Sequence, residues 1–340
     1  MRAAVVEEPP GIVVRDRPRP DPAPGQVVIA VERVGICGSD VPMVTGERVV
    51  PTPHVPGHEF AGRVAAVGTD VTGIAADDRV TAHIASGCGE CSYCLDGTPR
   101  LCTDIEEVGV TRDGAYAEYV AVQADTVYPL PDGLSFADGA SADPVASAAH
   151  AVNQSVLAPG DDIVVVGPGP IGLYAVQLAR ADGANRIVML GTRDERNRVA
   201  SEVGADVTVN VREEDVEARV SAAIGPEGAD AVVEATGNPE AIPTALAVAR
   251  KGAAVSVAGI HERPLSELEL DPIVRGERDL RGSFLYTGSE FQRSIDRLAA
   301  GTVTTDPIIT HSLPLTAIER AFDLIADREA IKVQLDPTAG

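Results

Sequence analysis

The strongest constraint on the fold is a regular alternation of short apolar segments and amphipathic segments in the second half of the chain. The expected strands cover residues 163–166, 187–190, 207–209, 231–235 and 253–258, and the expected helices cover 171–182, 194–203, 213–224 and 239–249. Short strands that are apolar throughout and separated by helices are typical of a parallel sheet covered on both faces. The sequence therefore predicts a doubly wound α/β domain.

A glycine-rich turn joins the first expected strand of this domain to its first helix. Gly167, Gly169 and Gly172 form the pattern G-x-G-x-x-G, with Pro170 and Ile171 before the last glycine. The first glycine permits a tight turn, the second lets the backbone approach a pyrophosphate, and the third lets the helix pack close to the strand. The free N–H groups and positive dipole end of the helix attract phosphates. We therefore expect a dinucleotide cofactor at this turn.

The end of the second strand distinguishes the two nicotinamide cofactors. A carboxylate there accepts a hydrogen bond from the ribose 2′-hydroxyl of NAD, whereas an arginine accommodates the 2′-phosphate of NADP. Gly191 occupies the usual place of the acid, and Thr192 and Arg193, which follow it, can hydrogen-bond and pair with a phosphate. Asp194 and Glu195 come next and oppose a further negative charge. The balance favours NADP over NAD.

The N-terminal part of the chain has a different character. Residues 1 to 130 are rich in Gly and Pro, with β-branched runs at 27–34, 63–67 and 116–122, which predict a loop-rich β domain. An Ala-rich segment at 137–152 has helical spacing, and the chain closes with an expected helix at 315–326 and strand at 331–335. A chain of 340 residues has room for two domains of roughly 150 residues each.

Four of the five cysteines crowd into one short segment. Cys88, Cys91, Cys94 and Cys102 have the spacing C-x2-C-x2-C-x7-C, which in an intracellular chain indicates metal binding more readily than disulfides. Four thiolates complete the tetrahedral coordination of zinc and leave no position for a substrate, so we expect a structural site. An iron–sulfur cluster is less favoured, because its fourth cysteine commonly lies far off or precedes a proline, whereas Thr103 follows here.

The fifth cysteine has a different setting. Cys37 lies in the segment Gly-Ile-Cys-Gly-Ser-Asp at 35–40, and His58 and Glu59 follow in Gly-His-Glu at 57–59. A cysteine, a histidine and a carboxylate are a suitable donor set for a catalytic zinc, which keeps at least one position open for water or substrate. Taken singly, Cys37 or His58 is more often an ordinary core residue.

The charge balance excludes some partners. The chain has 51 acidic and 28 basic residues, a net charge of -23, which repels phosphate backbones, so we expect no nucleic-acid partner. Lysine occurs only as Lys251 and Lys332. An acidic surface poor in lysine stays hydrated when salt screens its self-repulsion, so we hypothesise a salt-accumulating cytoplasm, with an acidic mesophilic protein as the alternative.

The chain shows no signal for secretion or membrane insertion. The residues after Met1 lack the apolar core of a secretory signal, and no later apolar run reaches the roughly 18 residues that a spanning helix needs. We therefore expect a cytoplasmic protein with no membrane partner.

Together these motifs resemble the zinc-containing medium-chain alcohol and polyol dehydrogenases, a family that includes sorbitol, threonine and secondary-alcohol dehydrogenases. The resemblance covers essentially the whole chain and includes Glu-Ala-Thr-Gly at 234–237 and Ile-Lys-Val at 331–333. It implies a GroES-like β-rich catalytic domain formed by residues 1–150 and 286–340, with a structural zinc lobe at 86–104, and a Rossmann domain at 151–285. It also implies a catalytic and a structural zinc, and a homodimer or homotetramer.

The resemblance also assigns roles around the catalytic metal. It implies that Cys37 and His58 bind zinc, with Glu59 as a third or exchangeable ligand. Asp143 falls where the polyol branches place a carboxylate at or near the metal; the less favoured alternative is a carboxylate at a helix N-terminus, which is worth about 0.3–1 kcal/mol. Asp40 matches a carboxylate that accepts a hydrogen bond from the other ring nitrogen of the zinc histidine and fixes its tautomer.

Three further positions concern the proton and the cofactor. Ser39 matches the family's hydroxyl relay, which takes a proton from the substrate. Many relatives continue the relay with a histidine five residues after the zinc cysteine, but this chain has Pro42 there, and nothing identifies His54 as a replacement base. Lys332 matches a basic residue that approaches the cofactor phosphates in relatives.

The predicted reaction is hydride transfer between a secondary alcohol, polyol or sugar hydroxyl and NAD(P), with zinc lowering the pKa of the hydroxyl. An L-threonine 3-dehydrogenase-like enzyme is the alternative, because Asp143-Pro144 occurs in similar form there, although no dedicated partner for an amino-acid carboxylate is evident. A zinc-free quinone or enoyl reductase would lack Cys37 and His58. A non-catalytic zinc- and NADP-binding sensor would have no use for Ser39 beside Cys37.

Overall fold

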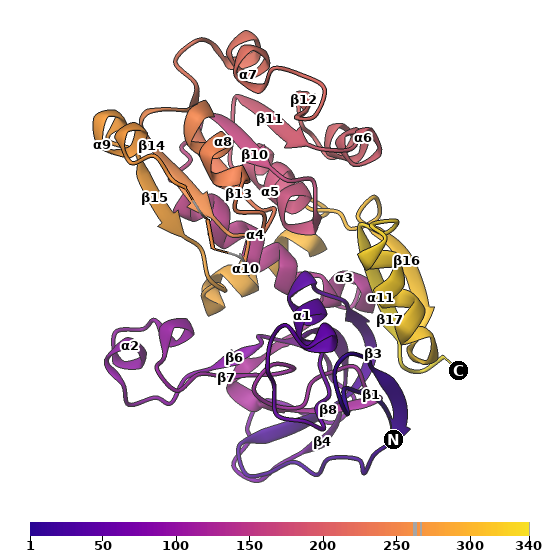
Figure 1. Cartoon of the computed structure of the whole chain (residues 1–340). Coiled ribbons are helices and arrows are strands. Elements are labelled where there is room, and N and C mark those ends of the chain that lie inside the picture. The colour runs from indigo at the N-terminus through magenta and orange to yellow at the C-terminus, as the bar shows by residue number, and fades with distance from the viewer. Residues whose placement is uncertain (261–263, 266, 340) are drawn as a thin grey trace. The chain divides into compact units, whose positions relative to one another are not determined.

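The computed structural model describes residues 1–260, 264–265 and 267–339. His261, a histidine with no motif around it in the sequence, lies outside the described residues. The chain divides into two units (Figure 1). The first unit comprises Met1–Asp143 and Thr287–Gly340, and the second comprises Pro144–Tyr286. The sequence placed the first boundary after residue 150, inside the helix expected at 137–152, and in the structure the first unit ends at Asp143. No helix within the described ranges is both long and apolar enough to cross a membrane.

The second unit is built on a six-stranded parallel sheet with the order β12-β11-β10-β13-β14-β15. The strands are β10 (Asp162–Val166), β11 (Arg186–Gly191), β12 (Val207–Asn210), β13 (Ala229–Glu234), β14 (Ala249–Val257) and β15 (Asp279–Gly282). The chain reverses its direction of travel across the sheet at β10, which is where doubly wound sheets bind ligands. The predicted doubly wound domain is therefore confirmed.

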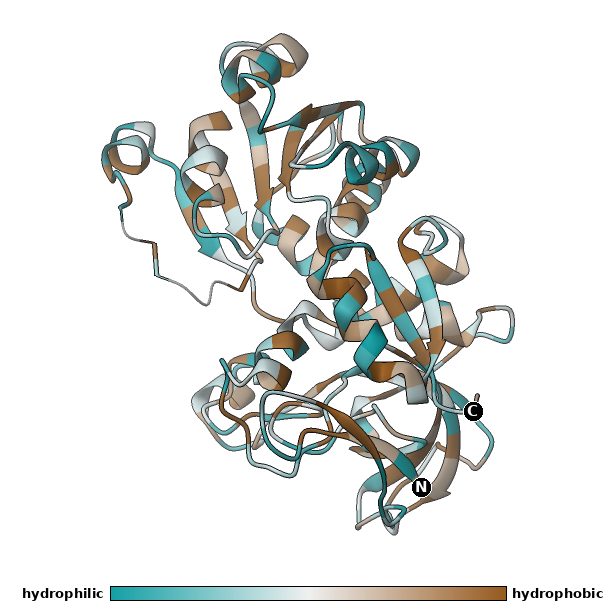
Figure 2. Ribbon diagram, turned by 45° about the vertical axis from the view of Figure 1, so that its right-hand side comes forward, coloured by the Kyte–Doolittle hydropathy of each residue, from teal (hydrophilic) through white to brown (hydrophobic). Residues whose placement is uncertain are grey.

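The helices of this unit are α4 (Ala142–Gln154), whose first two residues belong to the first unit, α5 (Pro170–Ala181), α6 (Asp194–Glu202), α7 (Val216–Ile224), α8 (Ala241–Val248) and α9 (Asp271–Gly276). An apolar cluster that includes Val164, Val188 and Val232 lies between strands and helices, and Figure 2 shows hydrophobic residues concentrated on the strands. The helix expected from residue 213 begins later, because Asp215 caps it by accepting a hydrogen bond from the backbone N–H of Ala218 at 3.1 Å.

Two elements of this unit were not predicted. The edge strand β15 has the sequence Asp-Leu-Arg-Gly, and all four residues are exposed, so the apolar signal that identified the other strands is absent. The six-residue helix α9 is too short to show a periodic pattern.

The first unit contains a seven-stranded, mainly antiparallel sheet with the order β16-β17-β3-β4-β5-β9, in which β8 also pairs with β3. Its strands are β3 (Gln26–Gly35), β4 (Glu59–Val67), β5 (Arg79–Ala82), β8 (Tyr119–Gln123), β9 (Val127–Pro129), β16 (Ile309–Pro314) and β17 (Lys332–Asp336). Two-stranded sheets are formed by β1 (Arg2–Val5) with β2 (Val13–Asp16) and by β6 (Ala85–Ser86) with β7 (Glu106–Glu107). The C-terminal strand β17 pairs with β3, which carries the tail of the chain into the N-terminal sheet.

The helices of the first unit are mostly short. They are η1 (Gly38–Asp40), α1 (Val41–Thr45), α2 (Ser92–Leu95), η2 (Pro99–Leu101), η3 (Ala124–Thr126), α3 (Phe136–Ala140), α10 (Gly288–Ala299), η4 (Leu315–Ala317) and α11 (Ile318–Ala326). The single helix expected at 137–152 is divided into α3 and α4. The carbonyl of Ala137 accepts hydrogen bonds from the side chains of Gln334 (2.8 Å) and Ser141 (3.1 Å) at this break. Such side-chain bonds compete with the helical backbone pattern.

Candidate functional site

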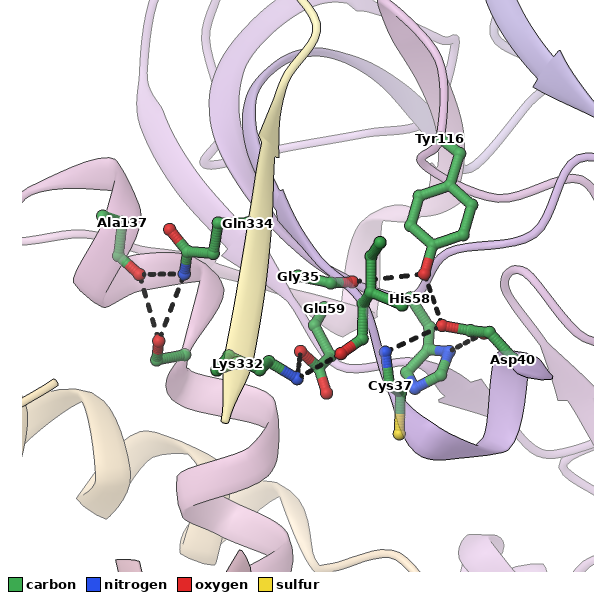
Figure 3. Close-up of polar contacts among 11 residues, drawn as sticks. Gly35, Cys37, Asp40, His58, Glu59, Tyr116, Ala137, Lys332 and Gln334 are labelled. Carbon is green, nitrogen blue, oxygen red and sulfur yellow. Dashed lines mark hydrogen bonds and ion pairs between the residues drawn. The ribbon is translucent and has the colours of Figure 1, made fainter. Parts of the chain in front are cut away.

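A cluster of three possible metal ligands lies where β3 ends and β4 begins. Cys37 follows β3, His58 precedes β4, and Glu59 is the first residue of β4. Strand pairing places Gly35 opposite Glu59, so the two segments meet. One ligand atom from each of Cys37, His58 and Glu59 lies within 4.8 Å of the other two, and Figure 3 shows these side chains around a common centre. The structure thus brings together residues that are far apart in sequence.

The donor set of this cluster fits zinc. It combines one thiolate, one imidazole nitrogen and one carboxylate oxygen, and three protein ligands leave a fourth position for water or substrate. Asp143, which was expected at or near this metal, lies buried in the first turn of α4 and is not a member of the cluster. Its role as a ligand therefore stays a prediction.

A buried carboxylate orients the histidine of the cluster. Asp40 is 0% exposed, and its Oδ1 lies 3.4 Å from Nδ1 of His58. Burial alone would raise the pKa of Asp40, but the charge and hydrogen bonding of His58 lower it below its ordinary value. Burial lowers the pKa of His58, and Asp40 raises it well above the ordinary range. Because Nδ1 faces Asp40, Nε2 remains for a metal, which agrees with the expected role of Asp40.

Asp40 is itself held by two donors. Its Oδ2 accepts hydrogen bonds from the backbone N–H of Cys37 at 2.9 Å and from the hydroxyl of Tyr116 at 2.5 Å. Tyr116 also packs against Gly57, where a Cβ atom would lie 2.5 Å from Cδ1 of the ring and the backbone has φ +99°. The glycine of the Gly-His-Glu segment is therefore needed for this packing. Sequence reasoning missed Tyr116, because the contact joins segments that no local pattern connects.

Lys332 forms a buried ion pair with the carboxylate of the cluster. Its Nζ contacts Oε2 of Glu59 and donates a hydrogen bond to the carbonyl of Ile36 at 2.8 Å, and the two side chains are only 3% and 2% exposed. Burial lowers the pKa of Lys332, but Glu59 raises it above the ordinary value, so the side chain remains an ammonium. A Cβ atom at Gly35 would overlap Oε2 of Glu59, so only glycine admits this pair.

This position differs from the one that the resemblance suggested for Lys332. The expected contact was with the cofactor phosphates, whereas the ammonium lies beside a metal ligand, on a strand between β16 and β3 rather than at a sheet edge. The cofactor contact therefore stays a prediction.

Three other residues considered in the sequence analysis can now be placed. Ser39 lies in η1, half-buried, two residues after Cys37, and Pro42 lies in the first turn of α1. His54 is buried, with Nε2 3.1 Å from the carbonyl oxygen of Gly109, so a structural contact accounts for it.

The four remaining cysteines form a second cluster around α2 and η2. Each of Cys88, Cys91, Cys94 and Cys102 has its sulfur within 4.8 Å of the others. Sγ of Cys91 lies 3.6 Å from that of Cys94 and 3.7 Å from that of Cys102. Tetrahedral zinc with Zn–S bonds of about 2.3 Å requires sulfur separations of about 3.8 Å. The geometry therefore fits a zinc ion bound by four cysteines.

The pKa values of two of these thiols diverge. A hydrogen bond from the backbone of Cys94, with further donors nearby, lowers the pKa of Cys91 to about 6. A backbone hydrogen bond from Gly89 lowers the pKa of Cys94, but burial and the neighbouring thiols raise it to about 12. Crowded thiols that cannot all ionise together are stabilised by a cation that replaces their protons.

The glycine-rich turn of the second unit has the conformation expected for phosphate binding. Gly167 has φ +105°, and a Cβ atom at Gly172 would overlap the carbonyl oxygen of Gly167, so the third glycine allows close packing of α5. Gly169 is the N-cap of α5, and a Cβ atom there would meet nothing within 4 Å. Pro170 and Ile171 begin the helix. The open space therefore lies at the helix N-terminus.

The end of β11 carries the residues expected to distinguish the cofactors. Gly191 is buried at the end of the strand, Thr192 is exposed, and Arg193 is the N-cap of α6. No carboxylate stands at the last position of this strand.

Two family models match the chain. Residues 23–132 match the alcohol dehydrogenase GroES-like domain, and residues 170–300 match the zinc-binding dehydrogenase model. The first range includes every cysteine and histidine of the two clusters, and the second includes the whole of α5.

Relatives that match over nearly their whole length are also dehydrogenases. The chain is 35% identical to sorbitol dehydrogenase of Bacillus subtilis strain 168, over 99% of this chain and 97% of the relative. It is 34% identical to L-threonine 3-dehydrogenase of Bacillus velezensis, over 96% of each. A crystal structure from Sinorhizobium meliloti 1021, described as a zinc-binding dehydrogenase bound to NADP, is 32% identical, with a TM-score of 0.93 over 99% of both chains.

Two glycine variants test the phosphate-binding turn. Gly172→Ala should lower the unfolding temperature, because overpacking against the Gly167 carbonyl costs about 1–3 kcal/mol. Gly169→Ala should leave the unfolding temperature close to that of the wild type but weaken cofactor binding at least tenfold, because its methyl group enters the open space at the helix end. Thermal unfolding and cofactor titration measure both effects. Unchanged cofactor affinity in Gly169→Ala would show that phosphate binds elsewhere.

A lysine variant tests the buried ion pair. Lys332→Met leaves the Glu59 carboxylate buried without a cation, which should destabilise the metal-free protein by roughly 3–5 kcal/mol. Zinc should restore part of this loss, because it supplies a replacement positive charge. Lys251→Met is the matched control, since Lys251 is exposed on β14. Equal unfolding temperatures for the two variants, with and without zinc, would contradict a structural role for the pair.

Proposed function

Because the chain belongs to the zinc-binding alcohol dehydrogenases of the medium-chain type, we propose that it oxidises a secondary hydroxyl of a polyol or sugar, and reduces the matching ketone, with NADP. The protein is an oxidoreductase that acts on CH–OH groups with a nicotinamide cofactor. The cluster of Cys37, His58 and Glu59 carries the proposal, since it provides three ligands and an open fourth position.

Each zinc has a proposed set of ligands. Cys37 and His58 hold the catalytic ion, Glu59 is a third or exchangeable ligand, and Asp143 is a further candidate. Cys88, Cys91, Cys94 and Cys102 hold the structural ion. When bound, the catalytic zinc supplies a Lewis acid that lowers the pKa of the substrate hydroxyl, and the nicotinamide supplies the hydride acceptor.

The surrounding residues have positioning roles. Asp40 faces Nδ1 of His58 as an ion-pair partner and so leaves Nε2 for the metal site, and the Tyr116 hydroxyl holds Asp40 in turn by donating a hydrogen bond to it. Lys332 balances the charge of Glu59 and competes with the metal for its carboxylate. Glu59 can therefore move between two cationic partners without becoming an unpaired buried charge.

Ser39 is the proposed first acceptor of the substrate proton. Its hydroxyl follows Cys37 closely in the chain and is partly exposed. Pro42 has no titratable group and cannot pass the proton further. The proposed route therefore runs from Oγ of Ser39 directly to solvent.

The choice of cofactor rests on the end of β11 and on one relative, and the proposed assembly rests on the family. The absence of an acid at Gly191, with Thr192 and Arg193 beyond it, favours NADP, and a structurally similar relative is bound to NADP. Because members of the family are commonly dimers or tetramers, we further propose that the protein is a homodimer or homotetramer, and that it lies in the cytoplasm.

An L-threonine 3-dehydrogenase-like activity is the second candidate, favoured by a relative of 34% identity. An amino-acid substrate needs a cation for its carboxylate. The buried Lys332 of the cluster is already paired with Glu59, so the polyol remains the preferred substrate.

Two cysteine variants separate chemistry from stability. Cys37→Ser should abolish turnover with little change in unfolding temperature or cofactor affinity, whereas Cys94→Ser should lower the unfolding temperature. Metal analysis should find that each variant retains one of the two zinc ions of the wild type. Near wild-type turnover in Cys37→Ser would contradict the catalytic assignment.

A substrate panel tests the proposed reaction. Polyols, aldoses, 2-alkanols and threonine are assayed by absorbance at 340 nm with NAD and NADP, at low and high salt because of the net charge of -23. We expect the highest kcat/KM with a polyol and NADP. A preference for threonine would establish the second candidate, and no turnover with any compound would favour a sensor.

A further inference from the structure

The side-chain space of Gly191 is already filled by two neighbours. A Cβ atom at this position would overlap Oδ1 of Asn197 and lie 2.8 Å from Cγ and 3.0 Å from Cδ of Pro168. Pro168 is buried in the glycine-rich turn, and its ring is rigid. Asn197 projects from α6 and is only 5% exposed. Position 191 therefore lacks an acidic residue, and it also lacks the space for an acidic side chain.

Asn197 is an unusual residue for its place. Buried positions of a helix that covers a sheet are normally apolar, as Ala200 is on the next turn. Among the residues that the structure describes, Oδ1 of Asn197 has no hydrogen-bond partner, and Nδ2 makes a long contact of 3.5 Å with the carbonyl of Val209. A buried polar atom without a partner is costly and calls for an explanation. The overlap with Gly191 is the same for either orientation of the amide, because its oxygen and nitrogen are similar in size.

We propose that Asn197, together with Pro168, determines the cofactor specificity. The two side chains fill the space beside Gly191 at the end of β11, so this position cannot hold the carboxylate that selects NAD. The inference deepens the proposed function, because it rests on a dinucleotide binding at the glycine-rich turn. With Asn197 in place, position 191 stays neutral and does not repel a 2′-phosphate. The cofactor preference is thus maintained by packing around Gly191, with Asn197 contributed by α6 and Pro168 by the glycine-rich turn.

The test places an acid at position 191 in a closed and an opened background. The closed background is the wild type, and the opened background carries Pro168→Ala and Asn197→Ala, with Asn197→Ala alone as an intermediate. Gly191→Asp is added to each, and the zinc-loaded proteins are titrated with NAD and NADP at fixed salt. Thermal unfolding of the same proteins reports the cost of the overlap independently of activity.

In the closed background, Gly191→Asp should lower the unfolding temperature and leave NAD affinity within about twofold of the wild type. In the opened background it should raise NAD affinity about tenfold, the gain typical of a charge-assisted hydrogen bond, and weaken NADP binding. Thr192→Asp is the matched control, because Thr192 is exposed and needs no space. Its effect should be the same in both backgrounds.

The possible results separate the two proposals. An equal gain of NAD affinity from Gly191→Asp in both backgrounds, with no loss of stability in the closed one, would overturn the role of Asn197 and leave the proposed function standing. Tighter NAD than NADP binding by the wild type would overturn the NADP preference and, with it, the inference that Asn197 selects the cofactor. No binding of either cofactor would instead count against the proposed function.

Discussion

The buried ion pair between Lys332 and Glu59 links the C-terminal strand to the metal ligands at the end of β3 and the start of β4. Two buried charges are tolerated only when they are paired and hydrogen-bonded, so β17 must enter the sheet in a register that brings Lys332 to Glu59. Gly35 leaves the space for this approach. The cluster therefore depends on residues from both ends of the chain, and the first unit cannot complete its site without its tail.

Each unit contributes a different kind of preorganisation. In the first, Tyr116, Asp40 and His58 form a chain of contacts that orients one nitrogen toward the metal position. In the second, backbone geometry at Gly167 and Gly172 exposes a helix N-terminus to phosphate. Side-chain hydrogen bonds thus prepare the metal centre, and backbone packing prepares the cofactor site.

Sequence reasoning succeeded where the signal is local. The alternation of strands and helices, the three glycines and the four clustered cysteines are short-range patterns with one physical explanation each, and the structure has them as expected. The contacts of Tyr116 with Asp40, of Lys332 with Glu59, and of Asn197 with Gly191 were not foreseen. They depend on pairing register and helix docking, which bring together residues without a shared pattern. The strand β15 was also not predicted, because its residues are exposed and lack the apolar pattern of a strand in the interior of a sheet.

The central claim is that a zinc ion with an open coordination position is bound by Cys37 and His58. A crystal of the active enzyme, grown with substrate and measured on both sides of the zinc absorption edge, tests this most directly. The account predicts an anomalous peak bonded to Sγ of Cys37 and Nε2 of His58, with a substrate oxygen in the remaining position. A fully active enzyme whose crystals show no metal between these two side chains would contradict it.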